Sequence, residues 1–221
     1  MNKKKKLIVL MSFLVIFIII SYYISTNEFL SIDRIIQNKI YGLRFDFLTK
    51  ILIFITYLGN WQTIVILCLL TLFFPFTRNR FSIPLIVSTL FSTVTYSLIK
   101  LYFARPRPDI SFHLINQGGY SFPSGHSLNS MVFYGILIWL CRENIINNNI
   151  SKFITGVLSI LIFLIGFSRL YLGVHFPSDI IAGWSLGSFI LLISINIFNK
   201  KYGNSKRGCK KTPQIENPLW S

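Results

Sequence analysis

Acidic residues and cysteines are both scarce in this sequence, so few side chains are available to bind a metal ion or to form a disulfide. Of 221 residues only seven are Asp or Glu, whereas 22 are Lys or Arg, so the formal net charge is +15. The three cysteines, Cys68, Cys141 and Cys209, match neither a disulfide framework nor a zinc motif. No cluster of carboxylates is available to hold Mg²⁺. We therefore expect no disulfide, no metal ion and no other cofactor.

Charged residues of either sign are also few for a soluble protein. They make up 13% of the chain, whereas 52% of the residues are hydrophobic and the mean hydropathy is +0.59. Apolar runs long enough to span a bilayer account for this composition. A basic chain can also bind nucleic acid, but here the cations lie mostly in the C-terminal tail and in short loops between apolar runs. We expect a membrane protein with no nucleic-acid partner.

Alanine, which typically marks a signal-peptide cleavage site, is missing near the N-terminus. Lys3–Lys6 followed by the apolar run Leu7–Ser25 resembles a secretory signal, but no alanine occurs before Ala104. The apolar run is also longer than the core of a typical signal peptide. We interpret it as an uncleaved membrane helix.

The apolar runs predict an all-α membrane protein with six spanning helices. Several runs are shorter than the roughly 20 residues that a bilayer requires, so flanking residues must complete them. Charged residues occur in these runs only at their ends, as expected where lipid cannot solvate a charge. The six runs are approximately residues 7–25, 61–76, 81–102, 127–141, 153–167 and 179–198.

Two segments between the first and second runs have a different character. Phe29–Tyr41 alternates apolar and charged residues, which predicts an amphipathic helix lying on the membrane surface. Phe45–Leu58 is more apolar. It could form a short buried helix, extend the second span, or span the membrane itself and raise the count to seven helices.

The distribution of Lys and Arg predicts the orientation of the bundle. With the N-terminus inside, 14 of the 22 cations fall on the inner side, so both termini are expected in the cytoplasm. In this topology Lys100 ends the third span and His126 begins the fourth, while Arg169 ends the fifth and Asp179 begins the sixth. All four residues are then expected at one outer face.

The first motif is Lys100 with Arg107-Pro108. The two cations are seven residues apart, so they share a face if the helix continues, and Pro106 makes an extended exit from the helix more favourable. Either geometry lets both face one anion, and the planar fork of arginine suits phosphate. The alternative is a pair of interfacial cations whose stems lie along apolar surface.

The second motif is Pro123-Ser124-Gly125-His126, directly before the fourth run. Ser124 suits a helix cap, and Gly125 lets the backbone approach a ligand closely. The free N–H groups of a helix start favour an anion, and His126 could donate a proton to a leaving oxygen. The alternative is an ordinary capped helix with an interfacial histidine.

The third motif is Ser168-Arg169 followed by His175 and Asp179, with Pro177 suited to the first turn of the last helix. Asp179 can accept the proton-bearing nitrogen of His175, which leaves the other ring nitrogen free to attack. A histidine and an aspartate at this spacing can also form a purely structural pair.

In this order the three motifs closely resemble the signature of the PAP2 superfamily of membrane lipid phosphatases, K-x6-R-P, P-S-G-H and S-R-x5-H-x3-D. The chain matches every position, and the resemblance covers roughly residues 45–198. It implies a six-helix membrane bundle whose motifs face outward, as in bacterial members of the family.

The resemblance also implies a role for each motif residue. His175 would be the nucleophile that forms a phosphohistidine, and Asp179 would orient it. His126 would protonate the leaving group and later help to activate water. No metal ion is implied, because cations would supply the charge stabilisation. The phosphate would be held by Lys100, Arg107, Ser124, Gly125 and Arg169.

The implied reaction is hydrolysis of a lipid phosphate or diphosphate at the outer face of the plasma membrane. Undecaprenyl diphosphate, phosphatidylglycerol phosphate and phosphatidic acid are the candidate substrates, and we expect no protein partner. The chain then divides into an anchor helix with an interfacial segment (1–44), a catalytic membrane domain (45–198) and a basic cytoplasmic tail (199–221) that we expect to be flexible.

Two other functions stay open on the same motifs. A non-hydrolytic lipid-binding or lipid-moving protein would need the cations but not the nucleophile. A vanadium haloperoxidase shares the phosphate pocket, but those enzymes are soluble. Arg105 forms a second Arg-Pro pair outside the motif spacing and is a secondary candidate for a phosphate contact, whereas Asp109 and His113 are interpreted as solvated loop residues.

Overall fold

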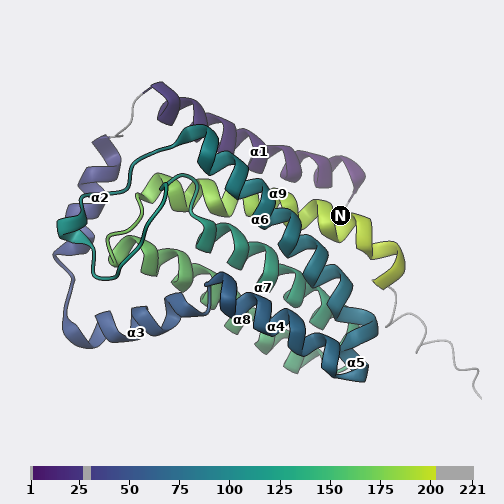
Figure 1. Ribbon diagram of the computed structural model, residues 1–221. Coiled ribbons are helices and arrows are strands. Elements are labelled where there is room, and N and C mark those ends of the chain that lie inside the picture. The colour runs from purple at the N-terminus through teal and green to yellow at the C-terminus, as the bar shows by residue number, and fades with distance from the viewer. Residues whose placement is uncertain (1, 27–30, 203–221) are drawn as a thin grey trace, which may run out of the picture.

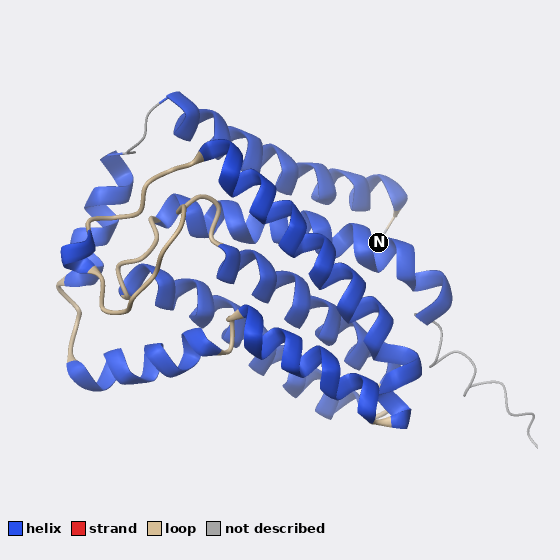
Figure 2. Cartoon of the chain, viewed as in Figure 1, coloured by secondary structure: helices blue, strands red, loops and turns tan. Residues whose placement is uncertain are grey.

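The structure is a computed structural model that describes residues 2–26 and 31–202, and within these ranges it is helical with no strand (Figure 2). Most of the basic tail predicted for residues 199–221 lies outside the described residues. The helices are α1 (Lys3–Thr26), α2 (Ser31–Tyr41), α3 (Asp46–Tyr57), α4 (Trp61–Phe73), α5 (Pro75–Thr77), α6 (Ile83–Phe103), α7 (Gly125–Asn144), α8 (Asn148–Tyr171) and α9 (Pro177–Tyr202).

The long helices α1, α6, α7, α8 and α9 run side by side, and α7 lies in the centre against α6, α8 and α9 (Figure 1). The apolar side chains Leu128, Ile136 and Leu140 of α7 are fully buried. On α9, Gly183 and Gly187 face α7 so closely that a Cβ atom would lie 2.7 Å from the Ser124 carbonyl and 2.9 Å from the Leu128 carbonyl. This spacing of small residues brings the two backbones together.

Four of the described helices are long and apolar enough to cross a membrane, and α3 with α4 makes a fifth if that bent pair is one span. The chain is therefore a multi-pass membrane protein, but the count of six spans stays a prediction. α7 falls outside this set because it carries small and polar residues, including Ser127, Asn129 and Ser130, which are buried against neighbouring helices. The four helices cover Lys4–Thr26, Arg80–Phe103, Asn148–Tyr171 and Pro177–Tyr202.

The segment predicted at Phe45–Leu58 forms α3, which meets α4 at an angle of 49°. The break contains Gly59, where a Cβ atom would lie 2.5 Å from Ile165 and 3.1 Å from the ring of His126. Glycine therefore lets the break contact both α7 and α8. This contact is what brings the following residue, Asn60, to the motifs.

The amphipathic segment forms a helix, α2, as its periodicity predicted. Its polar side chains Asp33 and Gln37 are buried, at 0% and 5% exposure, whereas Ile32 and Ile35 are more than half exposed. The side of α2 that carries Asp33 and Gln37 therefore faces the protein, whereas Arg34 and Lys39 are exposed, and the contacts of α2 are with α8 and α9. Its position at the membrane surface stays a prediction.

The three motifs meet at one end of the bundle. The C-terminal ends of α6 and α8, the N-terminal ends of α7 and α9 and the whole of α2 lie together at the left of Figure 1. The first described residues and the end of α9 lie at the opposite end. This arrangement agrees with the predicted topology, and the side of the membrane that each end faces stays a prediction.

Candidate active site

The motif residues surround a cavity of about 130 Å³ at the α2 end of the bundle. It contains members of all three motifs, although Lys100 and His175 are 75 residues apart in the sequence. The residues that line it are Gly59, Trp61, Tyr96, Lys100, Arg107, Gln117, Gly125, His126, Asn129 and His175.

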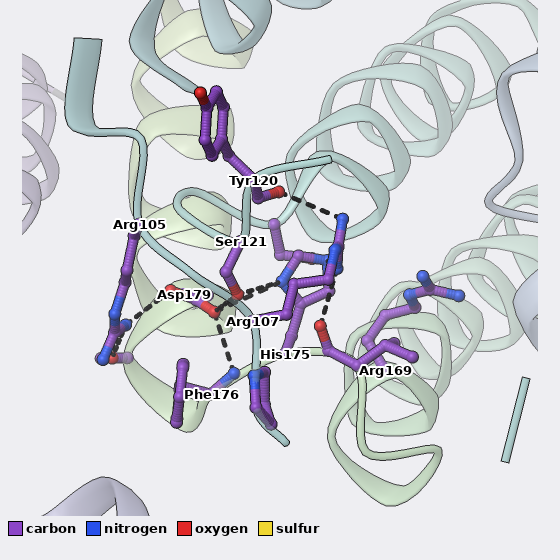
Figure 3. Close-up of polar contacts among 12 residues, drawn as sticks. Arg105, Arg107, Tyr120, Ser121, Arg169, His175, Phe176 and Asp179 are labelled. Carbon is purple, nitrogen blue, oxygen red and sulfur yellow. Dashed lines mark hydrogen bonds and ion pairs between the residues drawn. The ribbon is translucent and has the colours of Figure 1, made fainter. Parts of the chain in front are cut away.

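His175 and Asp179 form a buried pair beside this cavity (Figure 3). The ring Nδ1 lies 3.3 Å from Asp179 Oδ2, and the same oxygen accepts the Phe176 backbone N–H at 2.9 Å and the hydroxyl of Ser121. Because α9 begins at Pro177, Asp179 lies in its first turn, directly after the loop that carries His175. The carboxylate can accept an Nδ1 proton, which leaves the lone pair on Nε2.

The Nε2 atom of His175 faces Arg107, whose Nη1 lies 3.2 Å away. Burial, followed by the charges of Arg107, Lys100, Arg169 and Arg105, holds the pKa of His175 well below its ordinary value of 6.5. The imidazole is therefore neutral at neutral pH. A neutral ring with its Nε2 lone pair turned toward cations is the form that can attack an anionic phosphoryl group.

Backbone carbonyls of residues 118–121 orient two of the cations. Arg107 donates through Nε to Gly119 O at 2.9 Å and through Nη2 to Tyr120 O at 3.1 Å, while Lys100 Nζ donates to the carbonyls of Tyr120 and Ser121. Burial lowers the pKa of Arg107 to about 10, so it keeps its charge at neutral pH. Both cations are thus fixed before any substrate binds.

Arg169 is the third cation, and only 1% of it is exposed. Its Nη1 donates to Thr56 Oγ1 at 3.0 Å and its Nη2 donates to Gln117 Oε1. Its Nε is buried and has no hydrogen-bond partner among the described residues. Such an unpaired donor is unusual in a protein interior and is suited to an anionic oxygen.

His126 lies on the first turn of α7, and its Nε2 lies 2.6 Å from Asn60 Oδ1. An amide oxygen only accepts hydrogen bonds, so Nε2 carries a proton. The motif analysis missed Asn60. Asn60 follows Gly59 at a helix boundary that the sequence indicates. A boundary signal does not reveal that Asn60 contacts His126, 66 positions further along the chain.

Of the remaining predicted residues, Gly125 lines the cavity and Ser124 and Arg105 do not. The Ser124 hydroxyl caps α7 by accepting the Ser127 N–H at 3.4 Å, and the Ser124 N–H donates to the Asp179 carbonyl at 3.0 Å. Arg105 lies on the other side of Asp179 from Arg107 (Figure 3) and lines no part of the cavity.

The two polar loop residues Asp109 and His113 also lie outside the cavity lining. Asp109 accepts the Ser111 N–H, and His113 Nε2 lies 3.0 Å from the Pro108 carbonyl. Within the described part of the chain, no three His, Cys, Asp or Glu side chains are grouped closely enough to hold a metal ion.

Comparison with known proteins gives a consistent picture. The model of the PAP2 superfamily matches residues 81–202. Phosphatidylglycerophosphatase B of Bacillus subtilis is 28% identical over 193 residues, which are 86% of this chain and 94% of that protein. Undecaprenyl-diphosphatase of Sulfolobus acidocaldarius is 31% identical over 158 residues, which are 68% of this chain and 70% of that protein.

Two crystal structures share the fold. The PAP2-type phosphatidylglycerolphosphate phosphatase of Bacillus subtilis superposes with a TM-score of 0.79 at 25% identity, over 87% of this chain and 96% of that one. LpxE of Aquifex aeolicus superposes with a TM-score of 0.64 at 26% identity, over 77% of this chain and 98% of that one.

Proposed function

Since this chain belongs to the PAP2 superfamily and is a lipid phosphatase by its relatives, we propose that it hydrolyses a lipid phosphate or diphosphate through a phosphohistidine on His175, without a metal ion, at the outer face of the plasma membrane. The observation that carries this proposal is the position of the buried His175 ring between a carboxylate and the cavity. Asp179 lies at its Nδ1, and its Nε2 faces Arg107 in a cavity that Lys100 also lines.

In the first step Nε2 of His175 attacks phosphorus, and the bond from phosphorus to the lipid oxygen breaks. Burial, followed by the charge of Arg169, lowers the pKa of His126 well below 6.5, and the anionic phosphate bound beside it raises that pKa again, so His126 enters this step as an imidazolium. It gives a ring proton to that lipid oxygen, so the lipid leaves as an alcohol, or as a lipid monophosphate when the substrate is a diphosphate. Lys100, Arg107 and Arg169 stabilise the charge on the non-bridging oxygens. The Nδ1 proton of His175 stays on the ring and is donated in a hydrogen bond to Asp179, whose carboxylate stabilises the positive charge that develops on the ring.

In the second step water attacks the phosphohistidine. His126, now neutral, takes a proton from the water, and the bond from phosphorus to nitrogen breaks. Inorganic phosphate is released and His175 returns to its starting form. The two half-reactions use the same cations, because the charge on the phosphoryl oxygens is stabilised in the same cavity each time.

A second cavity supports a lipid as the leaving group. It has a volume of about 320 Å³, lies between α4 and α6, and shares Trp61, Tyr96 and Asn129 with the phosphate cavity. Its other lining is largely apolar, and Val65 and Leu90 at its edge are 45% and 63% exposed on the outside of the bundle. A lipid whose phosphate lies among the cations can extend an acyl or prenyl chain along this groove.

The two relatives direct the choice of substrates for a test. Purified protein in detergent is given undecaprenyl diphosphate, phosphatidylglycerol phosphate and phosphatidic acid, and phosphate release is measured with and without EDTA. The proposal predicts release from at least one lipid and equal rates in both conditions. A large loss with EDTA would contradict the metal-free mechanism, and no release from any lipid would favour the non-hydrolytic alternative.

A further inference from the structure

We propose that Asp33 and Arg105 are positioning residues for this reaction, joined to Asp179 in a buried chain of ion pairs that fixes the carboxylate behind His175. This inference rests on the proposed function. It assigns a role to α2, which lies outside the three motifs. It also assigns a role to Arg105-Pro106, the Arg-Pro pair that does not fit the motif spacing.

The arginine lies between two carboxylates. Arg105 Nη1 lies 2.6 Å from Asp179 Oδ1, and Nη2 lies 2.9 Å from Asp33 Oδ2. No more than 1% of any of the three side chains is exposed. Nη1 also donates to the Ser178 hydroxyl at 2.8 Å, and the guanidinium carbon lies 4.2 Å from the centre of the Phe176 ring. The planar fork of arginine makes these contacts together, whereas lysine has no matching geometry.

Asp33 joins α2 to the start of α9. Its Oδ1 accepts the Ser178 N–H at 2.9 Å, and its Oδ2 accepts the Ser178 hydroxyl at 2.6 Å. Ser178 directly precedes Asp179, so the same carboxylate that pairs with Arg105 also caps the first turn of α9. These bonds satisfy the carboxylate of Asp33 and account for its complete burial.

Arg105 also acts on the second oxygen of Asp179 through its backbone. Its carbonyl accepts the Ser121 N–H at 2.8 Å, and the Ser121 hydroxyl donates to Asp179 Oδ2. Oδ1 is therefore held by the arginine side chain, while Oδ2 is held by groups that leave it directed at His175 Nδ1. The orientation of the carboxylate is fixed at both oxygens.

The charge of the chain explains why two carboxylates are present. Asp179 paired with Arg105 alone would be a neutral pair, which would do little to stabilise positive charge on His175. Asp33 restores a net charge of −1 to the group while leaving the arginine in place. Removing any one partner of a buried set leaves the others uncompensated.

Charge changes at the two positions have opposite expected effects on His175. The charged and titratable groups that face this ring are Arg107, Lys100, Arg169, Arg105, His126 and Asp179. Loss of a nearby positive charge favours protonated histidine, and loss of a nearby negative charge disfavours it. Arg105→Gln should therefore move the acid limb of kcat/KM to higher pH, and Asp33→Asn should move it to lower pH.

The experiment measures phosphate release between pH 4 and 9 for Arg105→Gln, Asp33→Asn, the double variant and Arg105→Lys. We expect kcat to fall roughly 10- to 100-fold in each, because Asp179 is misplaced, with the inhibition constant of inorganic phosphate within about twofold of wild type, since the cavity lining is untouched. The double variant keeps the net charge of the group, so its acid limb should return toward wild type while its kcat stays low.

Matched controls are Asp109→Asn, a fully exposed carboxylate, and Arg142→Gln, an exposed arginine on α7 away from the site. Variants that keep wild-type kcat and pH profile would overturn the proposal. If Arg105→Gln and Asp33→Asn both moved the acid limb of kcat/KM in the same direction, the two residues would have a merely structural role. The same conclusion would follow if inhibition by inorganic phosphate weakened as much as kcat fell. If a single variant does not fold, the charge-balanced double variant carries the same test through its kcat. A wild type with no activity would instead count against the proposed function.

Discussion

The Nδ1 atom of His175 lies 3.3 Å from Oδ2 of Asp179, four residues further along the chain. The Phe176 N–H of the loop donates to the same oxygen at 2.9 Å, α9 begins at Pro177, and the carboxylate is fully buried. The pair selects the tautomer in which Nε2 is free. This relationship makes His175 the nucleophile of the proposed reaction.

Asp179→Asn tests the orienting carboxylate. The amide keeps the shape of the side chain but can donate to Nδ1 and stabilise the wrong tautomer, so we expect kcat to fall on the order of 10³- to 10⁴-fold, as for the aspartate of a hydrolytic triad. Steady-state kinetics on the best lipid should show this loss with KM little changed. Asp109→Asn serves as the control, and a loss of less than tenfold would contradict the assigned role.

The pH dependence follows from the lowered pKa of His175. Burial holds the pKa of His175 well below 6.5, so the acid limb of kcat/KM should have its midpoint below 6.5. Because the folded pKa lies below the unfolded value, the contribution of His175 to stability is present above pH 6.5 and is lost as the pH falls toward the folded pKa. A midpoint at or above pH 6.5 in the rate profile would show that this ring is not desolvated.

Asn60→Ala tests the residue that holds His126. Without its 2.6 Å contact the ring is free to turn, and we expect roughly a tenfold or greater loss of kcat on a lipid phosphate, whose alcohol is a poor leaving group. The loss should shrink on p-nitrophenyl phosphate, since that leaving group needs little protonation. Asn149→Ala, at an exposed position on α8, is the control. Equal losses on both substrates would assign Asn60 a structural role only.

Gly183→Ala tests the close approach of α9 to α7. The new Cβ would lie 2.7 Å from the Ser124 carbonyl, so the helices must separate, at a cost of about 1–3 kcal/mol. Gly156→Ala on α8 meets nothing within 4 Å and should be neutral or gain up to about 1 kcal/mol from helix propensity. Thermal unfolding in detergent measures both. A Gly183→Ala midpoint as high as that of Gly156→Ala would refute the packing argument.

The part of the site that lies at helix ends could be predicted from the sequence. Apolar runs end where lipid ends, so Lys100, His126 and Arg169 had to lie at helix ends, and a consistent topology brought those ends together. His175 and Asp179 were predicted to interact because four residues across a helix start leave little choice of geometry. These inferences depend on local periodicity, which the sequence contains.

The contacts that the sequence did not reveal join residues far apart in the chain. Asp33 contacts Ser178 across 145 positions, and Asn60 contacts His126 across 66. The alternation in α2 predicted a helix with polar side chains on one face. The same pattern is expected whether Asp33 faces water or, as here, is buried against Arg105. The apolar run at 127–141 predicted α7, but it did not reveal that polar side chains of this helix are buried against α6, α8 and α9.

The central claim, that His175 carries the phosphoryl group during turnover, is tested most directly by trapping. Wild-type protein is mixed with a radiolabelled lipid phosphate, quenched in alkali after a few milliseconds and digested, and the peptide that contains His175 is analysed. Our account predicts label that survives alkali, is lost in acid and lies on His175, with none in His175→Ala and a normal amount in His113→Ala. Turnover with no protein-bound phosphate, or label on another residue, would contradict it.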